Sequence, residues 1–326
     1  MRAIVYRQFG SPDVLKLEEV DRPNPGEGEV LVRVRAVGLN PYDWHFMRGE
    51  PVLFRPMMGV GVRRPRRQTI LGSDISGVVE AVGEGITRFR PGDDVYGTKG
   101  PGACAEYTVT KEKGLALKPA NLGFEEAAAV PMAALTALQS LRDFGRLEAG
   151  QKVLVNGASG GVGTFAVQIA KALGAAEITG VCSTGNLELV RSIGADQVVD
   201  YTANDFTRSG QRYDLVVDTV GNHPLGALRR VLTLKGTLAS VGGGGGRLLG
   251  PMAGMIWSKL LSPLVSQRLV SVMATIRAED LDYLRGLIEA GRINPVIDRV
   301  WPLAETAAAM RYLEQGHARG KVVITP

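Results

Sequence analysis

A glycine-rich turn between an apolar strand and a helix is the residue pattern in this sequence with the most specific chemistry. The segment 153–174, VLVNGASGGVGTFAVQIAKALG, carries four closely spaced glycines, Gly157, Gly160, Gly161 and Gly163. Glycines let a backbone turn tightly and approach a pyrophosphate, and the free amides at the start of the following helix attract the same anion. The pattern therefore predicts a dinucleotide site in this loop, to which Ser159 and Val162 also belong.

The polar residues after the next predicted strand indicate which dinucleotide binds. An NAD site usually has an acidic residue about 20 residues beyond the glycines, where it binds the ribose 2′-hydroxyl. This strand ends in VCSTGN, so the ribose end holds Ser183, Thr184 and Asn186 and no carboxylate. An uncharged end accepts a 2′-phosphate and favours NADP(H) over NAD(H), with Arg191 as a candidate counter-charge and Tyr201 as a candidate neighbour of the adenosine. Ser183 and Thr184 also suit helix capping, which is compatible with ribose binding.

Two regions of different pattern must position these motifs. Over the first 120 residues, β-branched runs such as EVLVRVRAVG and ISGVVEAVG are separated by turns rich in Pro and Gly, which predicts a twisted barrel or sandwich. The stretch 124–145, FEEAAAVPMAALTALQSLRDFG, has helical spacing. From Gln151 onward, apolar strands alternate with helices, which predicts βαβ units in a doubly wound parallel sheet. The predicted fold class is therefore α/β.

The C-terminal segment departs from this alternation. A helix is expected in AEDLDYLRGLIEAG and a last strand in GKVVIT. We expect this tail to return to the first region, which gives a catalytic and substrate domain of residues 1–122 and 275–326 and a Rossmann dinucleotide-binding domain of residues 123–274. A chain of 326 residues is longer than one ordinary core requires, in agreement with two domains.

Charge and composition exclude one class of partner. The net charge is +5, and much of the excess lies in one segment with five arginines, Arg55, Arg63, Arg64, Arg66 and Arg67. No aromatic residues are interleaved with these arginines, so a nucleic-acid site is not expected. The segment either steers an anionic ligand or is a solvated loop without a specific partner.

Cysteine usage and hydropathy indicate a reducing compartment without membrane contact. Cys104 and Cys182 belong to no CxxC or Cys/His cluster, which argues against a disulfide framework. The most apolar segment, 248–265, is interrupted by Pro251, Lys259 and Pro263, so no membrane-spanning helix is expected. The N-terminal MRAIVYRQFG has the pattern of a strand and not of a signal peptide. A cytoplasmic protein is expected.

Five motifs in combination resemble a known superfamily. They are VGLNPYDW, LGSDISGVVEAVG, RPGDDVYG, AAAVPMAALTAL and NGASGGVG. The chain resembles the medium-chain dehydrogenase/reductase superfamily, and within it the zinc-independent quinone oxidoreductase-like branch. The resemblance implies a GroES-like β-barrel catalytic domain and a Rossmann domain with the dinucleotide bound in a cleft between them. It also implies a homodimer, for which strands near residues 269–273 are candidates.

The resemblance bears directly on zinc. Zinc-dependent members of the superfamily hold the catalytic metal with Cys, His and Cys. This sequence has Asn40 at the first position, Ser73 at the second, and no Cys near Pro131 for the third. Of the four-cysteine structural lobe only Cys104 is present. Because a structural zinc site needs four ligands and a catalytic site needs three, no zinc is expected.

The resemblance implies hydride transfer from the nicotinamide C4 of NADPH to a quinone or an α,β-unsaturated carbonyl compound, without a Lewis acid. The family places the substrate at the positions of Asn40, Tyr42 and Asp43. Asn40 is a candidate hydrogen-bond partner of the substrate carbonyl or the ribose, and Tyr42 is a candidate proton donor, although core packing of Tyr42 and a structural role of Asp43 remain alternatives. The nicotinamide and its ribose are expected to contact Thr136, Gly242, Gly243 and Lys321.

Two other functions fit parts of the sequence. A sensor that binds NADPH, turns over little substrate and signals to a protein partner would use the basic segment. An alcohol or ketone dehydrogenase would share the fold, but the missing zinc ligands count against it. The insertion 51–68 is expected either to cap the substrate pocket with Phe54, Met57 and Met58 or to pack on a partner subunit.

Overall fold

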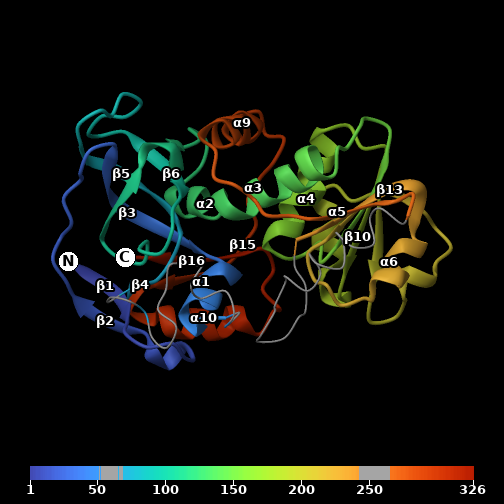
Figure 1. Cartoon of the computed structure of the whole chain (residues 1–326), viewed down its shortest axis with the longest axis horizontal. Helices are drawn as coiled ribbons and strands as arrows, with labels where there is room; N and C mark the ends of the chain where they lie inside the picture. The colour runs from blue at the N-terminus through green and yellow to red at the C-terminus, as the bar shows by residue number, and fades with distance from the viewer. Residues whose placement is uncertain (51, 53–64, 66–68, 242–264) are drawn as a thin grey trace. The chain divides into compact units, whose positions relative to one another are not determined.

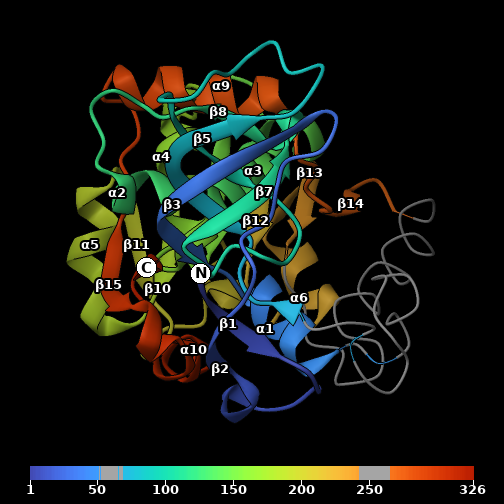
Figure 2. The same ribbon diagram turned by 90° about the vertical axis from the view of Figure 1, so that its left-hand side faces the viewer.

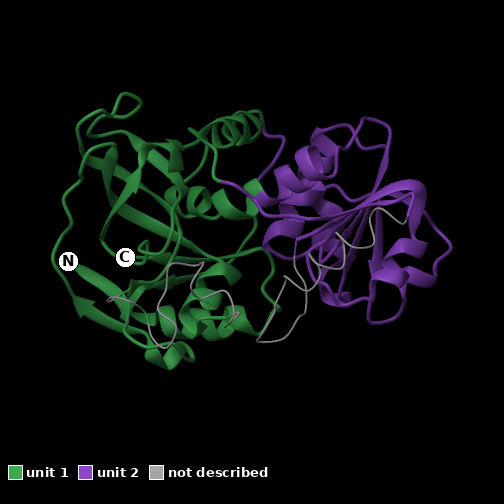
Figure 3. Ribbon diagram, viewed as in Figure 1, with its two compact units in different colours: residues 1–135, 276–290, 295–326 green, residues 136–275, 291–294 purple. Residues whose placement is uncertain are grey.

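The computed structural model describes residues 1–50, 52, 65, 69–241 and 265–326. Several residues singled out above lie outside the described part of the chain: Phe54, Arg55, Met57, Met58, Arg63, Arg64, Arg66, Arg67, Gly242 and Gly243. The chain divides into two compact units, which Figure 3 colours separately. Unit 1 comprises Met1–Leu135, Ile276–Ala290 and Pro295–Pro326, and unit 2 comprises Thr136–Thr275 and Gly291–Asn294. The domain bounds expected from the sequence, 1–122 with 275–326 and 123–274, refer to folding domains and not to compact units, so they stay a prediction.

Unit 1 begins with a small antiparallel sheet. In it β1 (Arg2–Tyr6) lies between β2 (Lys16–Glu19) and β4 (Thr69–Ile70), and a short helical turn, η1 (Pro12–Val14), connects the first two strands. The last four residues of β1 are buried. Apolar residues on both faces of this strand therefore pack against the rest of unit 1.

A seven-stranded sheet forms the main body of unit 1 (Figure 1). Its order is β15 (Ile297–Pro302), β16 (Lys321–Thr325), β3 (Glu29–Leu39), β5 (Asp74–Val82), β6 (Asp94–Thr98) and β8 (Leu115–Leu117), and β7 (Tyr107–Lys111) also pairs with β3. β16 runs antiparallel to β3, with Val323 opposite Gly38. The C-terminal tail therefore completes the sheet whose strand β3 leads into the predicted substrate residues.

Helices cover this sheet and close the core of unit 1. They are α1 (Pro41–Arg48), α2 (Phe124–Ala128), α9 (Ala278–Glu289) and α10 (Thr306–Glu314), with the short turns η3 (Glu112–Gly114) and η8 (Leu303–Glu305). Figure 2 shows α9 along β8, where the Tyr96 hydroxyl donates to the carbonyl oxygen of Leu281 over 2.7 Å. α2 approaches β3 so closely that a Cβ on Gly38 would lie 2.2 Å from the carbonyl oxygen of Ala128. This position therefore requires glycine.

The stretch expected to be one helix over 124–145 is divided. α2 ends at Ala128, α3 runs over Pro131–Gln139, and a wider π-type turn, η4, follows over Ser140–Phe144. Pro131 has no amide hydrogen and disfavours helical backbone in the residue before it, so the helix is interrupted there. The helical spacing was read correctly, but the effect of this proline was missed.

Unit 2 contains a six-stranded parallel sheet. Its order is β11 (Gln197–Asp200), β10 (Glu177–Cys182), β9 (Lys152–Asn156), β12 (Tyr213–Asp218), β13 (Leu232–Ser240) and β14 (Arg268–Ser271). The chain adds strands on one side of β9 and then on the other, which is the order of a doubly wound Rossmann sheet. Together with the β-rich unit 1, this order confirms the predicted α/β fold class.

The helices of unit 2 follow its strands. They are α4 (Gly161–Ala172), α5 (Leu187–Ser192) and α6 (Leu225–Arg230), with the short turns η5 (Thr184–Asn186) and η6 (Phe206–Arg208). Val153, Leu154 and Val155 of β9 are fully buried, as expected for a central strand with both faces covered. Among the described residues, no helix has the length and apolarity needed to cross a membrane.

Candidate functional site

The predicted dinucleotide loop begins at the carboxyl end of β9, where the strand order of the sheet reverses. Doubly wound sheets bind their ligands at this position. Gly157 has a φ of 83°, and a Cβ there would lie 2.4 Å from Thr219 Oγ1. A Cβ on Gly163 would lie 2.0 Å from the carbonyl oxygen of Gly157. Both positions exclude a side chain, so the backbone itself shapes the turn.

The turn leads directly into α4. Gly160 is the N-cap with an extended backbone, and Gly161, Val162 and Gly163 form the first turn of the helix. The first amides of a helix have no partner within it, and the helix dipole makes this end positive. Phe165 and Ile169 are fully buried and anchor the helix. The loop therefore presents fixed backbone donors to an anion, as a pyrophosphate site requires.

Hydrogen bonds connect the end of β10 and the polar residues after it to this loop. The amides of Gly157 and Ala158 donate to the carbonyl oxygen of Val181, over 3.1 and 2.9 Å. The Asn186 side-chain amide donates to Ser159 Oγ and to Ser183 Oγ, each over 3.1 Å. Asn186 Oδ1 is buried and has no hydrogen-bond partner among the described residues. The structure thus brings Ser159, Ser183 and Asn186 together beside the glycine turn.

A carboxylate that the sequence analysis missed lies beside these residues. Asp200 is the last residue of β11 and is opposite Cys182, the last residue of β10. Thr184 Oγ1 donates to Asp200 Oδ2 over 2.6 Å. Hydrogen bonds from Thr184 and Thr202 hold the pKa of Asp200 below its usual value. The signal was available as an acid at the end of the strand DQVVDY, but its position opposite β10 depends on strand pairing.

The sequence analysis also missed a hydrogen-bonded pair, Asn156 and Asp218, which connects the ends of two strands. Asp218 at the end of β12 is 1% exposed and accepts hydrogen bonds from the Asn156 side chain and from the amides of Val220 and Gly221. Asn156 is the last residue of β9. The pair therefore holds the carboxyl ends of β9 and β12 in place directly before the glycine turn, and we assign it a structural role.

The other predicted residues of unit 2 are less closely connected. Tyr201 follows Asp200 and is 50% exposed, and its amide donates to the carbonyl oxygen of Cys182 over 3.0 Å. Arg191 is exposed on α5. Thr136 is half-buried in α3, and its carbonyl oxygen accepts from Ser140 Oγ over 2.6 Å. Tyr201 therefore lies at the ribose end of the loop, whereas the expected role of Thr136 stays a prediction.

The predicted residues of unit 1 form a buried charged cluster. Lys321 is 3% exposed, and its ammonium donates to Asn40 Oδ1 and lies 3.5 Å from Asp74 Oδ2. The Asn40 side-chain amide donates to Asp74 Oδ2 over 2.9 Å and to Gly38 O over 3.2 Å. Because an ammonium only donates and a carboxylate only accepts, the two charges fix the orientation of the Asn40 amide. Asn40 is thus held rigidly and is only 4% exposed.

Asp43 extends this cluster into α1. Asp43 Oδ2 accepts from the backbone amide of Asn40 over 2.7 Å, in the manner of a capping residue at the third helical position. Burial, with a further contribution from the Asp74 charge, raises the pKa of Asp43 to about 7. Burial also raises the pKa of Asp74 and lowers that of Lys321, against the attraction between these two groups. The cluster holds two carboxyls for one ammonium, and protonation of Asp43 relieves the excess negative charge.

Tyr42 lies next to this cluster and is half-buried, with its ring centroid 4.4 Å from that of Phe46. Burial and the neighbouring Asp43 charge raise the pKa of Tyr42 to about 12. The phenol therefore keeps its proton at neutral pH. The alternatives of proton donor and packing residue both remain compatible with this position.

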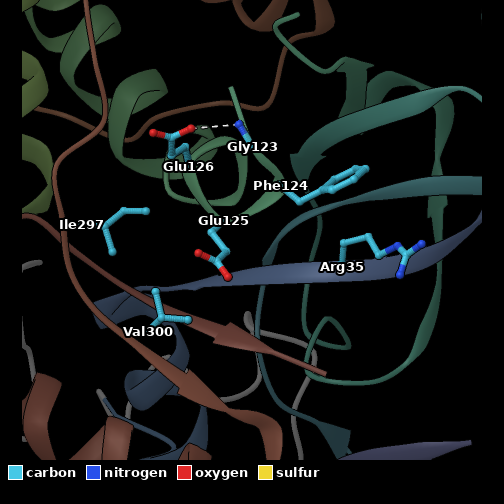
Figure 4. A pocket seen from close by; sticks show the side chains of 7 residues that line it. All are labelled: Arg35, Gly123, Phe124, Glu125, Glu126, Ile297 and Val300. Atoms are coloured by element: carbon cyan, nitrogen blue, oxygen red, sulfur yellow. Dashed lines mark hydrogen bonds between the residues drawn. The ribbon is translucent and has the colours of Figure 1, made fainter. Parts of the chain in front are cut away.

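A pocket of about 600 Å³ elsewhere in unit 1 is not part of this group. It is lined by Arg35, Gly123, Phe124, Glu125, Glu126, Ile297 and Val300, none of which is a predicted site residue. Figure 4 shows the Glu126 carboxylate turned back to the amide of Gly123, a hydrogen bond of 2.8 Å. Glu126 therefore caps the start of α2, and Arg35 and Glu125 are the other charged residues of the lining. Within the described ranges, no cluster of three or more His, Cys, Asp or Glu side chains could hold a metal ion.

Gly163 and Gly160 of the turn should differ in their tolerance of a side chain. We expect Gly163→Ala to lower the free energy of unfolding by about 1–3 kcal/mol, because the new Cβ meets backbone that cannot move aside. Gly160→Ala is the matched control, since its Cβ would have no neighbour closer than 3.5 Å and its φ is −83°. Urea unfolding of both variants measures the difference. Equal midpoints would contradict the close approach of Gly157 to Gly163.

The buried carboxyl of Asp43 should make stability depend on pH. Its folded pKa of about 7 lies above the unfolded value of about 3.9, so between these values the native state binds the extra proton. The native state therefore loses stability as the pH rises through this range. Asp43→Asn removes the titration and keeps an oxygen acceptor for Asn40. We expect the unfolding free energy of this variant to rise relative to wild type from about pH 5 to about pH 8.

Urea unfolding at several pH values measures this difference. Asp94→Asn, at an exposed position at the start of β6, is the control and should follow the wild-type curve. A constant difference between Asp43→Asn and wild type across the range would show that Asp43 is ionised in the native state throughout.

Two protein-family models match the chain. The alcohol dehydrogenase GroES-like domain matches residues 26–140, and the zinc-binding dehydrogenase model matches residues 193–324. The spinach (Spinacia oleracea) quinone-oxidoreductase homolog, chloroplastic, is 35% identical over 342 residues, which cover 100% of this chain and 98% of the relative. The NADPH-dependent alkenal/one oxidoreductase, chloroplastic, of Arabidopsis thaliana is 35% identical over 340 residues, which cover 100% of this chain and 80% of the relative.

A solved structure agrees with these relatives. The Escherichia coli quinone oxidoreductase complexed with NADPH matches with a TM-score of 0.85 and 26% sequence identity, over 100% of both chains. The likeness therefore extends over both the β-rich region and the Rossmann sheet. The resemblance that the five motifs indicated is confirmed: this chain belongs to the medium-chain dehydrogenase/reductase superfamily, in its quinone oxidoreductase branch.

Proposed function

We propose that this protein is an NADPH-dependent reductase that transfers a hydride to a quinone or an α,β-unsaturated carbonyl compound. The observation that carries the proposal is the glycine turn at the switch point of the Rossmann sheet, in a chain of the quinone oxidoreductase branch. The names of the Arabidopsis and Escherichia coli relatives, which refer to NADPH, to alkenals and alkenones and to quinones, support the same chemistry.

The residues of unit 2 fit the adenosine and pyrophosphate parts of the cofactor. The turn from Gly157 to Gly163 packs too closely to hold side chains at these two positions, and the first amides of α4 would bind the pyrophosphate. Ser183, Thr184 and Asn186 are the proposed contacts of the ribose, and the Asn186 amide holds Ser183 and Ser159 in place. When bound, the nicotinamide supplies the hydride. Thr136 and Lys321 are the proposed contacts of the nicotinamide and its ribose.

The buried charged cluster of unit 1 would orient the residues proposed to contact the substrate. Lys321 and Asp74 orient the Asn40 amide, and both of its N–H groups already donate, to Asp74 and Gly38. The proposed polar contact is therefore the remaining lone pair of Asn40 Oδ1, which can accept from a hydroxyl of the nicotinamide ribose. Tyr42 keeps its proton at neutral pH because its pKa is raised to about 12, and it is the proposed donor to the oxygen that gains negative charge. Asp43 holds the start of α1, so we propose that it positions Asn40 and Tyr42 without touching the substrate.

The proposed reaction needs no zinc. Asn40 and Ser73 stand where the resemblance places two ligands of the catalytic metal in zinc-dependent members. Here Asn40 is bonded to the Lys321 ammonium and to the Asp74 carboxylate. A cation of the protein therefore balances the charge of Asp74 in this cluster. Conjugated carbonyl substrates also need no Lewis acid, since conjugation activates the carbon that accepts the hydride.

NADPH oxidation in the presence of a metal chelator tests this proposal. We expect turnover with at least one member of a panel of 1,4-benzoquinone, 9,10-phenanthrenequinone and simple enones, because conjugation already activates the carbon that accepts the hydride. The control is the same assay with a simple aldehyde or ketone, which an alcohol dehydrogenase would reduce. Activity that the chelator abolishes would overturn the zinc-free mechanism. NADPH binding without turnover across the panel would favour the sensor.

We further propose a homodimer formed through β14. Among the described strands, β14 is the edge of the six-stranded sheet and pairs with β13 alone. An edge strand presents unpaired backbone groups to another chain. Met273, two residues beyond this strand, is 63% exposed, as an interface residue would be in an isolated chain. A cytoplasmic location and the lack of nucleic-acid or membrane partners stay predictions.

Sedimentation at micromolar concentration tests the dimer. We expect the wild type to sediment as a dimer and Met273→Arg to shift toward monomer, because the new charge would be buried in the interface. Leu234→Arg, which changes a side chain 80% exposed on β13, is the control and should remain dimeric. A wild type that is monomeric at this concentration would rule out the proposed interface.

A further inference from the structure

The carboxylate of Asp200 has no place in the function proposed so far, although it lies at the ribose end of the dinucleotide loop. β10 and β11 are parallel, and Cys182 is opposite Asp200 at their carboxyl ends. The residues that follow Cys182 are those proposed to hold the adenosine ribose. Thr184 Oγ1 reaches Asp200 Oδ2 over 2.6 Å. The carboxylate is therefore in direct contact with the ribose loop.

Among the described residues, no basic side chain forms an ion pair with Asp200. Its described partners are the hydroxyls of Thr184 and Thr202 and the backbone amide of Thr202. These hydrogen bonds favour the ionised form and hold the pKa of Asp200 below its usual value. Hydroxyl and amide partners stabilise a carboxylate but do not cancel its charge. A negative charge thus lies in contact with Thr184, in the loop proposed to hold the ribose.

We propose that Asp200 is a specificity-determining residue that limits the preference for NADPH by repelling its 2′-phosphate. This inference rests on the proposed dinucleotide site. A ribose phosphate carries a charge between about −1.5 and −2 at neutral pH, whereas the 2′-hydroxyl of NADH is neutral. Asp200 therefore acts on one cofactor and not on the other. The uncharged residues after β10 allow NADPH to bind, and the carboxylate of Asp200 at the end of β11 makes NADPH binding less favourable relative to NADH.

The variant Asp200→Asn isolates this charge. Asn keeps an oxygen that accepts from the Thr202 amide and hydroxyl, and its amide can donate to Thr184 Oγ1, so the turn is preserved. Asp205 provides a matched control in the same unit. Its Oδ1 accepts from the Thr207 amide over 2.9 Å and the Thr207 hydroxyl over 2.7 Å, the same turn that Asp200 makes with Thr202. Asp205 instead pairs with Arg208.

Fluorescence titration of the intact protein with NADPH and with NADH is the test. At an ionic strength of about 0.01 M, where the screening length is about 30 Å, we expect Asp200→Asn to lower the Kd of NADPH by about threefold to tenfold. The Kd of NADH should change by less than about twofold, because no charge faces Asp200 in that complex. The gain should decrease as salt is added. Asp205→Asn should leave both constants at their wild-type values.

Displacement by adenosine fragments locates the effect. Adenosine 2′,5′-bisphosphate should gain affinity in Asp200→Asn by a factor similar to that of NADPH, whereas adenosine 5′-monophosphate should not. Equal changes for NADPH and NADH, no change for either, or weaker NADH alone would each overturn the role of Asp200 while leaving the dinucleotide site standing. A wild type that binds neither dinucleotide would instead overturn the proposed function, and this inference with it.

Discussion

The backbone of the glycine turn packs so closely that two of its positions must be glycine, and the proposed dinucleotide site depends on this packing. A Cβ at Gly163 would lie 2.0 Å from the carbonyl oxygen of Gly157, and one at Gly157 would lie 2.4 Å from Thr219 Oγ1. Because no side chain fits, the chain can pass from the end of β9 directly into α4 and turn the first amides of the helix outward. The site proposed for the pyrophosphate in unit 2 depends on this close approach.

Buried charge is the corresponding constraint in unit 1. Removing an ammonium and two carboxyls from water is costly unless they compensate one another. Lys321, Asp74 and Asn40 do so by direct contact, and a raised pKa lets Asp43 take up a proton. The same arrangement fixes the Asn40 amide. The cluster therefore links the stability of this unit to the orientation of a proposed substrate contact.

Much of the fold was accessible from the sequence because local patterns encode local backbone. Runs of β-branched and apolar residues between turns indicated the strands, and the run of glycines between a strand and a helix indicated the predicted dinucleotide loop. Where local reading was wrong or incomplete, a single residue or a distant contact was responsible. Pro131 divides the helix expected over 124–145. The carboxylate at the ribose end was missed because only the residues directly after β10 were considered.

The sequence by itself determined the α/β class, the superfamily and the loop proposed to bind a dinucleotide, since each depends on residues close together in the chain. Tertiary structure alone decided which distant side chains share an environment. Lys321 reaches Asn40 across 281 positions because β16 pairs with β3, and Asp200 reaches Thr184 because β11 pairs in register with β10. Strand order and register set these contacts. They result from packing of the whole sheet, so no local pattern of residues reveals them.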